Sequence, residues 1–206
     1  MTPSPTLGVI LAGGQARRLG GGDKARIRIG GATILERIVD RLAPQCCALI
    51  LSANGDVTRF ADTGLTIVSD SVPGHAGPLA GILAGLDWAA EHADTEWIVS
   101  APSDCPFLPR DLVAQLHAAR IEAGAQLACA RSGERLHPVV ALWPLALRDD
   151  LRHALLMEGV RKVETWTARH GIGIAEWPAV PFDPFFNVNT AEDTAEADRI
   201  AAQYGN

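Results

Sequence analysis

Residues 7–24 read LGVILAGGQARRLGGGDK. Residues 7–12 form a short apolar run that ends in glycines, which is typical of a buried parallel strand. The following glycines let backbone N–H groups approach phosphate oxygens without an intervening Cβ, and Arg18 and Lys24 can neutralise a polyphosphate. The spacing matches neither G-x-G-x-x-G nor a P-loop motif. The stretch therefore predicts a strand and loop that bind the phosphates of a nucleoside triphosphate, with a flexible surface turn as the alternative.

Apolar runs and helical patterns alternate along the rest of the chain. Further strands are expected at residues 48–53, 65–68, 97–101, 125–131, 139–143 and 172–177. Helices are expected at residues 33–43, 78–92, 109–122, 145–157, 160–169 and 191–203. Thr33 and Glu36 form a capping box at the first of these helices. The alternation predicts an α/β fold: a single domain over residues 1–206 with a doubly wound, mostly parallel sheet and a small antiparallel excursion near residues 125–143.

Composition narrows the class of protein. The net charge of −6 gives no general attraction for nucleic acid or for an anionic membrane. No apolar run reaches the roughly 18 residues of a membrane span, and the first residues lack the basic region of a signal peptide. No two of the four cysteines form a C-x-x-C pair, and all four are interpreted as reduced thiols. We therefore expect a cytoplasmic protein without a structural zinc site.

Two aspartates follow predicted strands. Ligands of open α/β sheets bind beyond the carboxyl ends of the strands, so the loop at residues 13–24, Asp70 and Asp104 are expected on one rim. Asp104 lies in PSDCPFLP (residues 102–109), where flanking prolines hold it in place to ligate magnesium together with substrate phosphates. Asp70 can contact a base or ribose. The alternatives are a helix N-cap for Asp104 and an ordinary turn for Asp70.

Two further segments carry candidate ligand contacts. GPLAGILAGL (residues 77–86) opens a helix from a glycine loop, where its N–H groups can hold an anion or its small residues can serve close helix–sheet packing. Asn187 and Asn189 alternate, so in an extended segment their amides point the same way and can read a ligand. Alternatively, Asn189 or Thr190 caps the last helix. His137 is interpreted as structural, and no base near Cys105 in sequence would activate its thiol.

These motifs, in this order, resemble molybdenum cofactor guanylyltransferases. The segments that carry the resemblance are the opening loop, SDS (69–71), GPLAGILAGL, PSDCPFLP, HPVVALWP (137–144) and FFNVNT (185–190). Together they extend over about residues 7–195. The opening loop alone marks a broad nucleotidyltransferase superfamily, whereas its combination with the Asn-Val-Asn segment is much more specific.

The resemblance implies a reaction and a set of partners. It implies transfer of GMP from GTP to the terminal phosphate of molybdenum-molybdopterin, with release of pyrophosphate. It also implies Mg²⁺ on Asp104, with Lys24 and Arg18 stabilising phosphate charge. Transient contacts with proteins that insert molybdenum or accept the cofactor are implied as well. The residues matched to the nucleotide site are Leu11, Ala12, Gly13, Lys24, Ser52, Asp70 and Asp104, and those matched to the pterin side are Asn187 and Asn189.

Two features leave the choice of substrate open. The family often has a nucleotide-contacting asparagine at the end of the second strand, where this chain has Ser52, with Asn54 two residues further on. At Gly13, relatives that use pyrimidine or sugar nucleotides often resemble LAAG, so a missing methyl group can make room for a purine. The rival functions are a cytidylyltransferase acting on the same pterin and a non-catalytic molybdopterin carrier; Lys24 and Asp104 argue against the carrier, which needs no magnesium carboxylate.

Overall fold

Strand β1 (Thr6–Leu11) lies at the centre of the sheet. In the computed structural model, which describes residues 4–12, 23–72 and 77–204, its first five residues are buried and Leu11 is half-buried. It pairs in parallel with β4 (Ala48–Ser52) on one side and with β6 (Trp97–Pro102) on the other. A strand that is apolar on both faces is stable only in such a covered position.

The main sheet has seven strands in the order β5-β4-β1-β6-β8-β7-β9. The remaining strands are β5 (Thr66–Val68), β7 (Leu127–Ser132), β8 (Arg135–Pro144) and β9 (Ile172–Trp177). Strand β8 is antiparallel to both of its neighbours, and the other pairs are parallel. The predicted α/β fold with a mostly parallel sheet is therefore confirmed, and the predicted antiparallel excursion is the β7–β8 hairpin.

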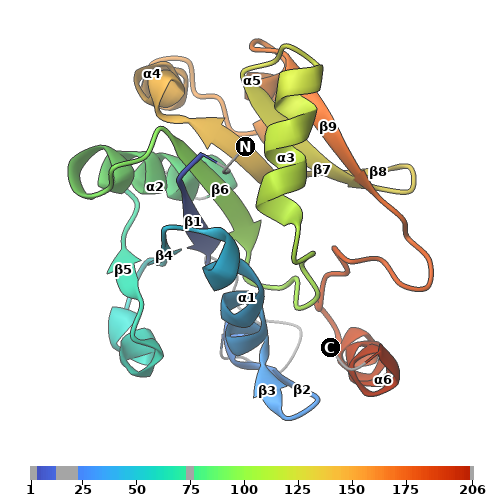
Figure 1. The fold of residues 1–206 in the computed structure, drawn as a ribbon. Helices are drawn as coiled ribbons and strands as arrows, with labels where there is room; N and C mark the ends of the chain where they lie inside the picture. The colour runs from blue at the N-terminus through green and yellow to red at the C-terminus, as the bar shows by residue number, and fades with distance from the viewer. Residues whose placement is uncertain (1–3, 13–22, 73–76, 205–206) are drawn as a thin grey trace.

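Helices cover both faces of the sheet (Figure 1). One buried cluster joins the sheet to α1 (Ile34–Leu42), α3 (Leu112–Glu122) and α6 (Ala191–Tyr204). A second cluster joins the opposite face to α2 (Pro78–His92), α4 (Arg148–Leu156) and α5 (Val163–Thr167). Across the described residues, no helix is both long and apolar enough to span a bilayer.

Several element boundaries differ from the sequence prediction. The capping box of Thr33 and Glu36 is present at α1. Helix α3 begins at Leu112 instead of residue 109, because Asp111 at its N-cap has ψ of 12°, outside the helical region. The structure adds a short hairpin of β2 (Arg28–Ile29) and β3 (Ala32–Thr33). Among the described residues it also adds the 3-10 helices η2 (Lys24–Arg26), η3 (Ala43–Gln45) and η4 (Val57–Thr63). The helix predicted at residues 145–157 opens with a 3-10 turn, η5 (Leu145–Leu147), before α4.

The connections on either side of β1 diverge. The chain passes from β1 through α1 to β4 on one face, and from β5 through α2 to β6 on the other. Leu11 lies in register with Ser52 and with Pro102, so three strands end side by side there. A reversal of strand order at carboxyl ends leaves a crevice in which ligands bind.

Candidate active site

A pocket of about 330 Å³ opens at this crevice. Its floor contains the strand ends Leu11, Ser52 and Pro102. The other residues that line it are Lys24, Asn54, Asp70, Gly77, Pro78, Gly81, Ser103, Asp104 and Val139. The backbone closes the floor, because Ala12 N–H donates to Ser52 O (2.8 Å) and Ser103 N–H donates to Leu11 O (3.1 Å). A mostly apolar crevice with a few charged side chains is the usual form of a small-molecule site.

Lys24 is the cation that faces this pocket among the described residues. It begins the 3-10 helix η2, which follows directly on Asp23. Its Nζ lies 3.6 Å from Asp104 Oδ2, and both side chains are largely buried, with exposed fractions of 17% and 20%. The same Nζ donates a hydrogen bond to Asn189 Oδ1. The ammonium group therefore joins the end of the first loop to two segments far away in the sequence.

Asp104 reaches the pocket from the turn after β6. Burial raises the pKa of its carboxyl group, and the charge of Lys24 opposes this rise. Its backbone carbonyl accepts a hydrogen bond from Val188 N–H (2.9 Å). The alternative role of a helix N-cap does not apply, because Asp111 occupies that position at α3. Asp104 is thus a buried carboxylate facing a cation and a pocket.

Asp70 and Asn54 bind each other on the wall of the pocket opposite Lys24 and Asp104. Asn54 Nδ2 donates to Asp70 Oδ2 (2.7 Å), and Asp70 N–H donates to Asn54 Oδ1 (2.9 Å). Burial raises the pKa of Asp70, and the Asn54 amide opposes this rise. The site assignment from sequence omitted Asn54, although its position two residues after Ser52 was the available signal. Ser52 itself lies on the floor and is only 4% exposed.

Asn187 and Asn189 both lie against the Asp104 segment. Cys105 Sγ donates to Asn187 Oδ1 (2.8 Å), and Asn189 contacts Lys24 as described. Thr190, not Asn189, caps α6, because Thr190 Oγ1 accepts from Asp193 N–H (3.1 Å). The Asn189 side chain is therefore free of the capping role and reaches the site.

The start of α2 serves packing and also borders the pocket. A Cβ on Gly81 would lie 2.8 Å from Ser52 Oγ and 2.9 Å from Leu11 Cδ2, and one on Gly85 would lie 2.7 Å from Val9 Cγ2. Close helix–sheet packing therefore requires both glycines. Gly77, Pro78 and Gly81 also line the pocket. The packing role expected from the sequence is therefore confirmed, and the anion-binding role of the N–H groups stays a prediction.

The remaining residues singled out from the sequence differ in where they lie. Leu11 and Ala12 lie at the pocket end of β1. Gly13 and Arg18 lie outside the described residues. His137 is buried against Ser132 Oγ (2.7 Å) and the Phe185 ring, which agrees with a structural role. The four cysteines are free, and burial raises the pKa of Cys105 well above its ordinary value, so its thiol stays protonated.

The donor set fits a magnesium ion held jointly with a substrate. No group of three His, Cys, Asp or Glu side chains suited to a metal occurs among the described residues. Magnesium, however, commonly binds one or two carboxylates together with waters and substrate phosphates. Asp104 supplies such a carboxylate; burial raises its pKa, and a cation beside it opposes that rise, as Lys24 does.

Comparisons with known proteins agree with this geometry. A sequence model of the MobA-like NTP transferase domain matches residues 8–171. The chain is 58% identical over 202 residues to the molybdenum cofactor guanylyltransferase of Nitrobacter hamburgensis, covering 98% of this chain and 97% of that relative. It is 59% identical over 197 residues to the protein of the same name from Rhodopseudomonas palustris, covering 95% and 94% respectively.

Solved structures show the same fold. The molybdopterin-guanine dinucleotide biosynthesis protein A of Archaeoglobus fulgidus superposes with a TM-score of 0.73 at 22% identity, covering 96% of this chain and 100% of that one. The 2-C-methyl-D-erythritol 4-phosphate cytidylyltransferase of Thermus thermophilus superposes with a TM-score of 0.69 at 18% identity, covering 96% and 99%. Together with the domain match and the near full-length relatives, these findings show that the chain belongs to the molybdenum cofactor guanylyltransferase family and is a nucleotidyltransferase of molybdenum cofactor biosynthesis.

Proposed function

We propose that this enzyme transfers GMP from GTP to the terminal phosphate of molybdenum-molybdopterin and releases pyrophosphate. The observation that carries the proposal is the Lys24–Asp104 pair, which faces the pocket at the point where the strand order reverses. The names of the relatives point to a guanylyl group and to the molybdenum cofactor. The cation, the carboxylate and the paired Asn54 and Asp70 match the needs of a nucleoside triphosphate: charge neutralisation at one wall and hydrogen bonding at the other.

The reaction joins two phosphates. An oxygen of the terminal phosphate of the pterin attacks the α-phosphorus of GTP, a new P–O–P bond forms, and the bond from the α-phosphorus to the bridging oxygen of pyrophosphate breaks. The acceptor phosphate is already ionised, so the reaction needs no strong general base. Positioning and charge stabilisation are then sufficient for catalysis.

Lys24 is the residue that stabilises the developing charge in this proposal. Its ammonium group has three N–H donors, so contacts with Asp104 and Asn189 leave it able to donate to a phosphate oxygen. Asn187 and Asn189 contribute to the pterin side, next to the Asp104 segment. Asp104 would hold Mg²⁺, which, when bound, neutralises phosphate charge.

Replacing Asp104 tests the proposal. Asp104→Asn preserves the shape of the side chain and removes the charge, so we expect pyrophosphate release with GTP, Mg²⁺ and molybdenum-molybdopterin to fall by at least about 100-fold. Asp149→Asn is the matched control, because Asp149 is 79% exposed and pairs only locally with Arg148. Circular dichroism checks that both variants fold. Full activity in Asp104→Asn would overturn the assignment of Asp104.

The identity of the nucleotide needs a separate measurement. Turnover of the unmodified enzyme with each of the four nucleoside triphosphates should be fastest with GTP. A preference for CTP would replace this proposal with the rival cytidylyltransferase, which shares the fold.

A further inference from the structure

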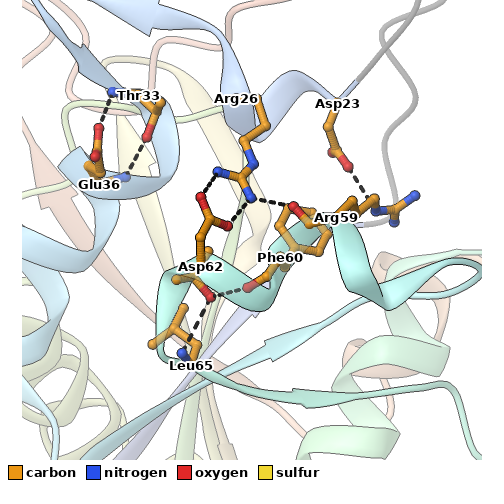
Figure 2. A network of polar contacts seen from close by, with 9 residues as sticks. Asp23, Arg26, Thr33, Glu36, Arg59, Phe60, Asp62 and Leu65 are labelled. Carbon is orange, nitrogen blue, oxygen red and sulfur yellow. Dashed lines mark hydrogen bonds and ion pairs between the residues drawn. The ribbon is translucent and has the colours of Figure 1, made fainter.

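The 3-10 helix η4 lies beside the site and contributes no residue to the pocket lining. It is capped by Asp56, whose Oδ1 accepts from Thr58 N–H (3.0 Å), and it buries Phe60 completely. Figure 2 shows that two side chains of η4, Arg59 and Asp62, point toward the segment that contains Asp23 and Arg26. Lys24 lies in this segment, directly after Asp23.

Arg59 joins the two walls of the pocket. Its Nε lies 2.9 Å from Asp23 Oδ2, and its Nη2 donates to the backbone oxygen of Asn54 (3.0 Å). Asp23 immediately precedes Lys24, while Asn54 holds Asp70 through two hydrogen bonds. A single guanidinium group therefore connects the wall that carries the cation to the wall that carries the Asn54–Asp70 pair.

Further contacts surround Arg59. Its guanidinium lies over the buried Phe60 ring, 4.9 Å from the ring centre. Arg26 donates to both carboxylate oxygens of Asp62 and to the backbone oxygen of Arg59. The 3-10 helix η4 is thus attached to residues 23–26 at two points, Asp23 and Arg26 (Figure 2).

The buried carboxylate of Asp23 depends on the positive charge of Arg59. The Asp23 side chain is only 11% exposed. Burial raises the pKa of Asp23, and the positive charges of Arg59 and then Arg26 oppose that rise. Removing Arg59 would leave a buried carboxylate beside Lys24, where it would compete with Asp104 and with substrate phosphates for the ammonium group.

We propose that Arg59 is a positioning residue for nucleotide binding: by holding Asp23 and the Asn54 carbonyl together, it sets the distance between Lys24 and the Asn54–Asp70 pair. The inference rests on the proposed function, because it assumes that this pocket takes the nucleoside triphosphate. Arg59 acts through its neighbours, so its loss should weaken nucleotide binding more than it slows the chemical step.

Three variants test the proposal. Arg59→Gln keeps a hydrogen-bond donor but removes the positive charge and the forked set of guanidinium N–H groups. We expect KM for GTP to rise by about tenfold while kcat changes by less than about twofold. Arg59→Lys restores the charge opposite Asp23 but cannot span both partners, so its KM should be intermediate. Arg110→Gln is the control, because Arg110 also pairs with a carboxylate, Asp40 Oδ2 (2.5 Å), and with a backbone oxygen, at an exposed position.

Calorimetric binding of GTP, measured without the pterin, separates this inference from the proposed function. A wild-type KM and dissociation constant in Arg59→Gln, in an enzyme that transfers GMP, would overturn the role of Arg59 alone. An equal loss of kcat and of thermal stability in Arg59→Gln and Arg110→Gln would overturn it as well. If the unmodified enzyme binds GTP and transfers no GMP, the proposed function fails, and the comparison of dissociation constants still decides the role of Arg59.

Discussion

At the scale of the residue, His117 is held in one protonation state by its neighbours. Thr6 Oγ1 donates to Ser4 O (2.9 Å), so the 2.8 Å contact between Thr6 Oγ1 and His117 Nε2 requires an N–H on Nε2. Arg120 Nε donates to His117 Nδ1 (3.3 Å), which requires a lone pair on that nitrogen. The neutral imidazole satisfies both contacts and links α3 to β1.

The neutral state of His117 predicts a loss of stability in acid. Burial, followed by the charge of Arg120, lowers the pKa of His117 from 6.5 to about 4. Because the unfolded chain takes up this proton near pH 6.5 and the folded chain does so only near pH 4, the free energy of unfolding falls as the pH falls between these values. Between pH 7 and pH 5 we expect this residue to remove about 1–2 kcal/mol, measured by urea denaturation. His117→Gln, which can still donate to Thr6, should lose less; an equal pH dependence in both proteins would contradict the prediction.

Single residues also show where sequence reasoning stops. The sequence indicated that Asp70, Asp104 and Lys24 share a rim, because each follows or extends from a strand end. It could not indicate that Lys24 contacts Asn189, or that Cys105 donates to Asn187, since these pairs are far apart in the chain and depend on how residues 183–190 fold back. The sequence pointed to Asn54 only as the asparagine after Ser52, because its contact with Asp70 depends on a side chain reaching across to another strand end.

At the scale of the element, α2 must approach the sheet closely at two glycines. Gly85 faces Val9, and Gly81 faces Leu11 and Ser52, which line the pocket. A methyl group at either position would require something to shift, which costs about 1–3 kcal/mol, partly offset by the roughly 1 kcal/mol better helix propensity of alanine. The two glycines therefore have similar packing roles, but of the two only Gly81 lines the pocket.

This difference gives a paired prediction. Both Gly81→Ala and Gly85→Ala should lower the free energy of unfolding, by up to about 2 kcal/mol in denaturant titrations. Only Gly81→Ala should also raise KM for GTP, because the displaced Leu11 and Ser52 belong to the pocket floor. A similar rise in KM for Gly85→Ala would show that the effect travels through the whole helix.

Elements with a clear run or helical spacing of apolar residues could be predicted from the sequence, and irregular elements could not. The strands of the main sheet follow from apolar runs, and α1 follows from its capping box. The β2–β3 hairpin has two residues in each strand, too few to show alternation. The 3-10 helix η4, which carries Arg59, is seven residues long and buries only Phe60. Its sequence therefore lacks the helical spacing of apolar residues that would predict a helix. The contacts that η4 makes beside the site therefore could not be predicted from the sequence.

At the scale of the whole molecule, the pocket lies where the connections on either side of β1 diverge, so a nucleotide bound there, as proposed, would contact segments from both halves of the sheet. The lining residues come from β1, η2, β4, α2, β6 and β8 and from the loops after β4, β5 and β6. A ligand that binds only when all these segments are assembled stabilises the folded state as a whole, by about 2.7 kcal/mol at a concentration 100 times its dissociation constant.

Nucleotide binding should therefore be visible in thermal unfolding. For a chain of this size we expect GTP with Mg²⁺, at such a concentration, to raise the Tm by about 5–10 °C. CTP at the same concentration should raise it less, because the proposed site is selective for guanine. In Asp104→Asn, the part of the increase that depends on Mg²⁺ should disappear, whereas Asp149→Asn should retain it. If CTP gave the larger shift, the assignment of guanine would be wrong while the location of the nucleotide pocket would stand; if neither nucleotide shifted the Tm, the pocket itself would be the wrong site.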